Sequence, residues 1–382
     1  MGRKNDVLIL SVIDPTRAYS CIKYLCQYLH DKHVDVECWS NVSENNIKEY
    51  HKWPIKTHSY IESIFGKIPK VRTIYKRFVG FLYAYAYRNR TIICHDLFHY
   101  QSCRKIKRRY PNTKLILYFT EIYNEKHSPL VQSLQRKFLK SPNDMDYMIE
   151  CDYFREEYRR EKNGVTKPSG TILNTIPMTE LAESIRIPRH KNDVPIIVYS
   201  GGIHLPGEFD IIINALKDIP DDFIMEFYCF GNQDAIKQLN IECEKKIRGK
   251  YRIITNQPRK NVYAAIRNAD IGIVYYDPEY SINTLYAAPT KFYEYVGLNV
   301  PVVCSANESL MYIIEKYNLG EIMPQNSSAG MKSAIEKLIR DDKYRERISA
   351  SEKKTFETIL CYEKQSEDAL SSILKIIEGD RT

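Results

Sequence analysis

The sequence predicts an α/β protein of two domains, each built on a parallel sheet. The chain has 382 residues, and domains usually hold about 100–200 residues, so two domains are expected. Short apolar runs alternate with longer segments of helical pattern, which is typical of parallel sheets covered by helices on both faces. A polar stretch over 177–195 interrupts this alternation and predicts a linker.

In the first half, apolar runs predict the strands and the segments between them predict the helices. The expected strands are 7–12, 34–39, 91–94, 115–119, 147–150 and 171–173, and the expected helices are 19–30 and 101–109.

The second half repeats the pattern. Its expected strands are 196–199, 224–230, 251–254, 271–275 and 300–304, and its expected helices are 209–216, 260–269 and 290–296, with a long charged helical tail over 342–378. Two such halves are Rossmann-like, and ligands of these folds bind at the carboxyl ends of the strands, where helix N-termini face the crevice.

Positive charge is concentrated in one window. The net charge is +8, yet residues 61–110 hold twelve basic side chains against two acidic ones. Within this window Lys70, Arg72, Lys76 and Arg77 interleave with aromatic residues, which suits contact with an anionic membrane and a lipid-linked acceptor. The pattern also fits a helix with a charged, solvated face. No nucleic-acid-binding motif accompanies it, so nucleic acid is not an expected partner.

Cysteine usage and the chain's start indicate the compartment. The ten cysteines are irregularly spaced without a CxxC pair, which favours small buried side chains in a reducing compartment over a zinc site or a disulfide framework. The N-terminus leads directly into a short apolar run, and no apolar run reaches the roughly 20 residues of a spanning helix. We therefore expect a cytoplasmic protein that can lie at the inner face of the membrane.

The most informative residues lie near position 290. Pro289 and Thr290 predict a helix start, with a turn and a hydroxyl cap. Lys291 and Glu294 are three residues apart and therefore share one face of that helix. A cation there can meet a phosphate beside the helix N-terminus, and a carboxylate one turn later can accept hydrogen bonds from a ribose diol. An isolated pair with this spacing also fits a surface ion pair.

The segment from Asn283 to Val303 resembles the signature N…P-x-K-x-x-E-Y…G-x-P-V-V of the GT-B glycosyltransferases, specifically the retaining transferases of family 4. Other stretches agree with that family in order: the glycine-rich turn at 199–207, the A-D-I at 269–271, the H-D pair at 95–96, and the segments 118–125 and 173–177.

The resemblance implies a GT-B fold, with two Rossmann-like domains that face a central cleft. We expect an acceptor domain over 1–180, a linker over 181–194, a donor domain over 195–350 and a helix over 351–382 that can pack back on the first domain. It implies a nucleotide-diphosphate sugar as donor substrate and no cofactor. No acidic D-x-D pair is found where a metal-dependent transferase would need one, so metal use is not expected.

The resemblance also implies roles for particular residues. Glu294 would bind the ribose, and Lys291 with nearby backbone amides would bind the diphosphate. The donor-binding residues implied in this way are Gly201, Gly202, Asn283, Thr290, Lys291 and Glu294. For acceptor activation the candidates at strand ends are Glu121, Asp96 and His95. Each also fits a structural role, and a leaving diphosphate that takes the proton itself would need none of them.

The chain departs from the family pattern at three informative positions. Tyr286 lies eight residues before Glu294, where many members carry another glutamate; Pro206 replaces a frequent lysine, and Thr120 a frequent histidine. We expect a transferase that moves a hexose-like sugar from a nucleotide diphosphate to a saccharide or lipid-linked acceptor, with retention, in surface polysaccharide biosynthesis. The alternatives are a nucleotide-sugar 2-epimerase of the same fold and a catalytically inactive assembly partner.

Overall fold

The computed structural model describes residues 6–16, 21–43, 46–60, 69–124, 126–186, 188, 192–203 and 208–379. The chain divides into two compact units: unit 1 holds Met1–Ile172 with Ser366–Thr382, and unit 2 holds Leu173–Gln365. Pro206 lies outside the described residues, as does the side chain of Lys70. In the described part of the chain, no helix is both long and apolar enough to cross a bilayer.

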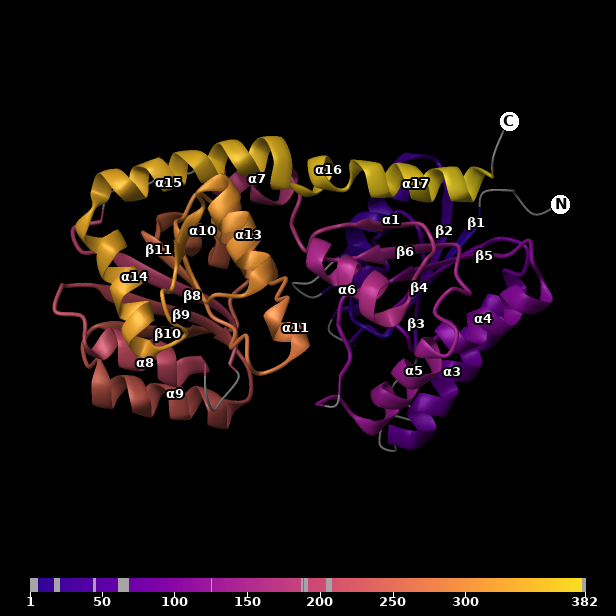
Figure 1. Cartoon of the computed structure of the whole chain (residues 1–382), viewed down its shortest axis with the longest axis horizontal. Coiled ribbons are helices and arrows are strands. Elements are labelled where there is room, and N and C mark those ends of the chain that lie inside the picture. Colours follow the sequence, from indigo (N-terminus) through magenta and orange to yellow (C-terminus); the bar gives the residue numbers. More distant parts are fainter. Residues whose placement is uncertain are drawn as a thin grey trace. The chain divides into compact units, whose positions relative to one another are not determined.

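Unit 1 is built on a seven-stranded parallel sheet with the strand order β3-β2-β1-β4-β5-β6-β7. Its strands are β1 (Asp6–Leu10), β2 (Asp35–Ser40), β3 (Lys56–Ser59), β4 (Thr91–His95), β5 (Lys114–Tyr118), β6 (Tyr147–Glu150) and β7 (Ser169–Thr171). Its helices are α1 (Cys21–Asp31), α2 (Ile47–Tyr50), α3 (Pro69–Ala86), α4 (Tyr100–Arg109), α5 (Pro129–Leu139), α6 (Tyr153–Asn163) and α17 (Glu367–Glu378), and all but α2 are labelled in Figure 1.

The central strands of unit 1 are apolar because helices cover them. All five residues of β4 are buried. Side chains alternate along a strand, and Ile92 and Cys94 join one core cluster with residues of α3, α4 and α5. Helix α6 begins where the carboxylate of Asp152 accepts hydrogen bonds from backbone N–H groups, and it ends at Gly164 in the left-handed conformation.

Unit 2 is built on a six-stranded parallel sheet with the strand order β10-β9-β8-β11-β12-β13. Its strands are β8 (Ile196–Gly202), β9 (Ile224–Phe230), β10 (Tyr251–Thr255), β11 (Ile271–Val274), β12 (Val302–Cys304) and β13 (Gly320–Ile322). Its helices are α7 (Met178–Arg186), α8 (Glu208–Lys217), α9 (Gln233–Lys246), α10 (Arg259–Asn268), α11 (Ile282–Leu285), α12 (Thr290–Gly297), α13 (Glu308–Tyr317), α14 (Ser328–Arg340), α15 (Asp342–Thr355) and α16 (Tyr362–Gln365), with a π-helical turn at Phe356–Leu360.

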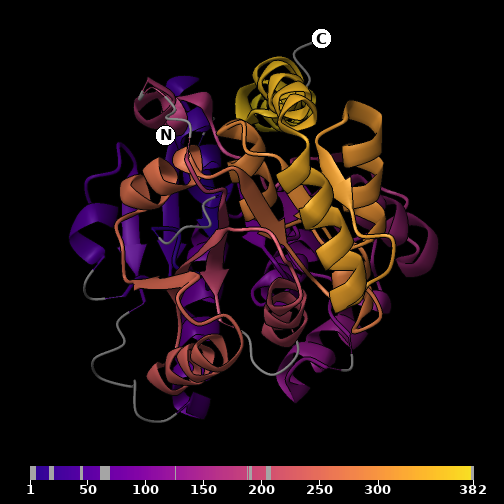
Figure 2. The same cartoon turned by 90° about the vertical axis from the view of Figure 1, so that its left-hand side faces the viewer.

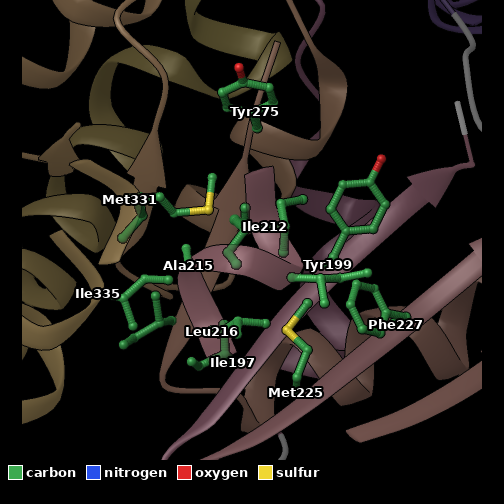
Figure 3. Packing of buried hydrophobic residues seen from close by; sticks show 14 of the residues in the cluster. Ile197, Tyr199, Ile212, Ala215, Leu216, Met225, Phe227, Tyr275, Met331 and Ile335 are labelled. Carbon is green, nitrogen blue, oxygen red and sulfur yellow. The ribbon is translucent and has the colours of Figure 1, made fainter. Parts of the chain in front are cut away.

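Two apolar layers enclose the sheet of unit 2, and Figure 2 shows this unit with helices on both sides of its strands. On one face, Ile197 and Tyr199 of β8 pack with Ile212 of α8 and Ile335 of α14, as Figure 3 shows. On the other face, Val198 belongs to a cluster with α10, α12 and α13. The alternation along β8 therefore buries both of its faces.

The predicted pair of parallel α/β sheets is confirmed, and three local predictions differ. Of the glycine-rich turn expected over 199–207, Gly201 and Gly202 belong to the end of β8 because they pair with β9, and residues 204–207 lie outside the described residues. Residues expected in the linker form α7, whose Leu181 is fully buried in the core of unit 2. The single expected helix over 342–378 is several helices, of which α15 and α16 belong to unit 2 and α17 belongs to unit 1.

Candidate functional site

The strand order of unit 2 reverses between β8 and β11, since β9 and β10 follow on one side and β12 and β13 on the other. Open parallel sheets bind ligands outside the carboxyl ends of their strands at such a reversal. Here Gly201 and Gly202 end β8, and Tyr276 follows β11. Gly201 and Gly202, two of the residues predicted to bind a donor, thus lie at the expected edge of the sheet.

Lys291 lies beside the end of β8. Its Nζ lies 4.0 Å from the ring centre of Tyr199 and 5.2 Å from that of Tyr276, so two aromatic rings hold the ammonium by cation–π attraction. A Cβ at Gly201 would lie 3.0 Å from this Nζ, and Gly201 has φ +146°, which L side chains rarely adopt. The absence of a side chain at Gly201 therefore leaves space for the ammonium of Lys291. This cation lies where the strand order of the sheet reverses.

Helix α12 is anchored to the sheet through Tyr295. The hydroxyl of Tyr295 accepts a hydrogen bond of 2.8 Å from the backbone N–H of Ser200 at the end of β8. Its ring packs where a side chain on Gly272 would otherwise lie, since a Cβ there would come within 2.6 Å of the ring. The ring and the hydroxyl together fix α12 against β8 and β11, and Thr290 and Lys291 are the first two residues of this helix.

Glu294 lies one turn after Lys291 and is 8% exposed. Its Oε1 accepts a hydrogen bond of 2.8 Å from the guanidinium of Arg259, and the hydroxyl of Tyr263 lies 3.4 Å from the same oxygen. Among the described residues, Oε2 has no hydrogen-bond partner. The carboxylate is therefore oriented through one oxygen, and the other is left to accept hydrogen bonds from a ligand.

Arg259 was not predicted from the sequence. It is the first residue of α10 and also lies 4.0 Å from the carboxylate of Glu180. A signal was present, because a cation at a helix N-terminus is disfavoured by the helix dipole and needs a compensating anion. Glu294 lies 35 residues further along the chain, so spacing alone could not identify it as that anion.

Asn283 lies on α11, a short turn closed by a capping box between Ser281 and Thr284. The buried side-chain amide of Asn307 donates to the carbonyls of Tyr276 and Thr284 across 3.0 and 2.6 Å. This amide ties the segment after β11 to the segment after β12. Asn283 is therefore carried on a loop whose two ends are fixed.

In unit 1, His95 ends β4 and Asp96 follows it, and both belong to a buried network. The Nδ1 of His95 lies 2.9 Å from the hydroxyl of Ser11, and its Nε2 lies 3.3 Å from the hydroxyl of Thr120. Asp96 has φ 57°, and its carboxylate accepts from the N–H and the hydroxyl of Thr120 across 3.1 and 3.0 Å. Burial lowers the pKa of His95 while the Asp96 charge opposes this, which favours the neutral imidazole.

Glu121 is partly exposed, unlike His95 and Asp96. Two arginines of α6 hold the backbone here, since Arg155 donates to the carbonyl of Thr120 and Arg159 to that of Glu121, each across 2.7 Å. These arginines are four residues apart and so share one helix face, a spacing that is visible in the sequence. Of the three predicted catalytic residues, Glu121 is the one that is not buried.

Arg159 also forms a buried ion pair. Its Nε donates to Oε1 of Glu150 across 2.7 Å, and both side chains are fully buried. Burial raises the pKa of Glu150, and the Arg159 charge acts in the opposite direction. This pair connects β6 to the backbone that carries Glu121.

The predicted basic patch is only partly at the surface. Lys70, Arg72, Lys76 and Arg77 all lie on α3. Lys76, however, is 7% exposed, donates to Oδ1 of Asn41 and lies 5.9 Å from the ring centre of Tyr60. Lys76 therefore belongs to the inner face of α3, which corrects its assignment to a membrane-facing patch.

Nine of the ten cysteines are buried and Cys21 is partly exposed, as predicted for small apolar side chains. Within the described ranges, no three His, Cys, Asp or Glu side chains lie together in a way that could hold a metal ion.

Residues 182–355 match the family model described as "Glycosyl transferases group 1". The match lies within unit 2 and includes every donor-binding residue predicted above. No curated protein matches the sequence.

The whole chain is similar to solved structures of low sequence identity. The glycosyltransferase from Rickettsia africae ESF-5 has a TM-score of 0.74 at 14% identity, covering 98% of this chain and 100% of that chain. Anabaena HepE in complex with UDP and glucose has a TM-score of 0.75 at 12% identity, covering 97% and 99%. Sucrose-phosphate synthase from Thermosynechococcus elongatus has a TM-score of 0.68 at 13% identity, covering 97% and 98%.

Proposed function

Because the chain has the two-domain GT-B fold of glycosyltransferases and its residues 182–355 match the group 1 model, we propose that it transfers a sugar from a nucleotide-diphosphate sugar to an acceptor. The observation that carries this proposal is the position of Lys291 over Gly201 at the reversal point of the unit 2 sheet. A fixed ammonium beside a helix N-terminus is suited to a diphosphate.

In this proposal Lys291 and the first amides of α12 stabilise the negative charge that develops on the departing diphosphate. These donors are held before the substrate arrives, so little reorganisation opposes the reaction. The first N–H groups of a helix have no partner inside it, and Pro289 provides no side-chain cap, which leaves room for a ligand's oxygens. Gly201 and Gly202 let the backbone approach the phosphates closely.

Glu294 is proposed to bind the ribose through Oε2 while Arg259 holds Oε1. The solved HepE complex contains UDP, so we propose a uridine nucleotide as the first donor to test. We further propose transfer of a hexose-like sugar with retention, without a metal or cofactor, to a saccharide or lipid-linked acceptor in surface polysaccharide biosynthesis. Glu121 is the proposed acceptor base, and location in the cytoplasm stays a prediction.

A thermal-shift series tests the donor proposal. UDP-, GDP-, ADP- and CMP-sugars are added separately to the full chain, and we expect one nucleotide to raise the melting temperature selectively. Release of the nucleotide is then measured with and without candidate acceptors. Donor consumption that yields an isomeric donor without an acceptor would favour an epimerase, and tight binding without turnover would favour an inactive assembly partner.

The Glu294→Gln variant examines the ribose contact. It keeps the shape of the side chain and removes its charge, and we expect most of the nucleotide-induced shift to disappear. Glu315→Gln on α13 is the matched control, since Glu315 is exposed on the same unit. A full wild-type shift in Glu294→Gln would count against the assignment.

A further inference from the structure

The outer face of α3 in unit 1 is apolar. Among the side chains described for this helix, every exposed one is apolar or aromatic. The large ones are Val71 (37% exposed), Ile74 (68%), Phe78 (59%), Phe81 (39%), Leu82 (47%) and Tyr85 (43%). These six residues, named here the α3 stripe, fall within about 100° of arc and extend over about 21 Å of helix.

This arrangement is the reverse of an ordinary surface helix, whose charged residues face water. In α3 it is Lys76 that faces inward, whereas Ile74 and Phe78 face outward. The inner face is fully used, because Gly80 packs against the ring of His99 so tightly that a Cβ would lie 2.3 Å from its Nδ1. Rotation of the helix about its axis is therefore blocked, and the stripe stays at the surface. Large contiguous apolar patches of this kind mark interaction sites.

Cationic side chains border the stripe. Arg88 is exposed and its guanidinium lies 4.7 Å from the ring centre of Tyr85. Arg109 is also exposed, and its guanidinium lies 5.8 Å from the ring centre of Tyr110, which itself contacts Tyr85. Along the helix, Arg72 and Arg77 are partly exposed. On α4, three further basic residues pair with Asp144 or Asp146 and do not belong to this border: Arg104, Lys107 and Arg108.

We propose that the α3 stripe inserts into the interface of an anionic lipid bilayer, with the bordering arginines at the phosphate headgroups. An apolar face flanked by cations complements such a surface, because the acyl region takes the apolar side chains and the headgroups take the charges. A second copy of this chain fits less well. A two-fold interface would place the stripe and its arginines against the same residues of the partner, and like charges would meet.

The inference does not rest on the proposed transferase activity, and it changes which residues carry the membrane contact. Ile74 and Phe78, rather than Lys76, are the residues expected to drive binding to the membrane. Apolar insertion is not screened by salt, whereas attraction between arginines and headgroups is. Salt should therefore weaken binding without removing the difference that the stripe makes.

Vesicle flotation of the full chain tests the proposal. The vesicles are pure phosphatidylcholine or an equimolar mixture of phosphatidylcholine and phosphatidylglycerol. The wild-type protein is expected to float with the anionic mixture. The double variant Ile74→Ser, Phe78→Ser should lower the partition coefficient about tenfold or more, because two large apolar side chains lose their buried area. The matched control is Ile241→Ser, Ile359→Ser, whose side chains are 45% and 40% exposed on unit 2, and it should bind like wild type.

Two further readouts keep the test decisive. Phe78→Trp should emit at shorter wavelength when anionic vesicles are added, while Ile241→Trp should not. The double variant should melt like wild type and keep its nucleotide-induced shift, which separates lipid binding from donor binding. Wild-type failure to float, or equal flotation of the double variant, overturns the proposal. So does a wild-type dimer that the double variant dissociates without any loss of lipid binding.

Discussion

The guanidinium of Arg259 donates to Oε1 of Glu294 across 2.8 Å, and the hydroxyl of Tyr263 lies near the same oxygen. One side of the carboxylate is thereby fixed by protein groups. The other oxygen, Oε2, keeps its capacity to accept hydrogen bonds. Arg259 thus orients Glu294, and in the proposed function it acts on the nucleotide only through that carboxylate.

Replacing Arg259 by Gln should weaken nucleotide binding without abolishing it. A hydrogen bond to a charged group contributes about 1.5–3 kcal/mol. Because the side chain of Arg259 is 27% exposed, we expect the lower end of that range, about tenfold in Kd. Calorimetric titration with the selected nucleotide measures this change.

Two matched variants examine whether Arg259 acts by orientation. Arg259→Lys keeps the charge and should recover part of the affinity, and KM should rise more than kcat falls. Arg252→Gln removes another arginine–glutamate pair of unit 2, between Arg252 and Glu226 at 2.7 Å, and should bind nucleotide like wild type. Unchanged affinity in Arg259→Gln would remove Arg259 from the site.

Replacing Gly201 by Ala should displace Lys291. The new Cβ would lie 3.0 Å from Nζ of Lys291, and the backbone φ of +146° would be strained in any L residue. The lysine end is flexible, so the contact with it costs little stability and the backbone strain is the larger cost. The displaced ammonium would bind a diphosphate less well. We expect nucleotide affinity to fall about tenfold or more. Gly231→Ala is the control, since its Cβ would make only ordinary contacts at 3.6 Å or more.

Strong apolar runs made the buried strands predictable from the sequence. The bounds of β6 and β9 agree with the predicted 147–150 and 224–230, because both strands lie within their sheets and read as continuous apolar segments. The edge strands β3 and β13 were missed, since each is short and β3 consists of Lys-Thr-His-Ser. Edge strands need fewer apolar residues because less of their surface is buried.

From residue spacing alone, the site was predictable only where its partners are close in sequence. The spacing of Lys291 and Glu294 placed them on one helix, which the structure contains. The contact from Arg259 depends on how α10 and α12 pack together, and nothing local encodes that contact. The inward direction of Lys76 depends likewise on Asn41, which lies 35 residues away.

Replacing Glu150 by Gln should destabilise unit 1. The substitution leaves the guanidinium of Arg159 fully buried without its carboxylate, and breaking a buried pair costs about 3–5 kcal/mol. Urea unfolding followed by circular dichroism measures the free energy of unfolding. The control is Glu244→Gln, whose partner Arg248 is 83% exposed, and it should cost less than about 1 kcal/mol. Equal effects of the two substitutions would show that the buried pair is not stabilising.

The stability of unit 1 should fall in acid partly through His99. Burial, with help from Arg77 and Lys76, lowers the pKa of His99 to about 3, against about 6.5 in an unfolded chain. Between these values the unfolded state binds a proton that the folded state does not. Lowering the pH therefore favours unfolding, and this contribution to stability is fully present above about pH 6.5 and lost towards pH 3.

The His99→Gln variant isolates this contribution, since glutamine keeps a polar group near Tyr60 and cannot titrate. Between pH 6 and pH 4, the free energy of unfolding of wild type should fall more steeply than that of the variant, by up to about 1.4 kcal/mol per pH unit. Urea unfolding at several pH values measures both slopes, with His51→Gln as a control at an exposed histidine of the same unit. Parallel slopes for wild type and His99→Gln would mean that His99 takes up its proton in the folded protein as readily as in the unfolded chain.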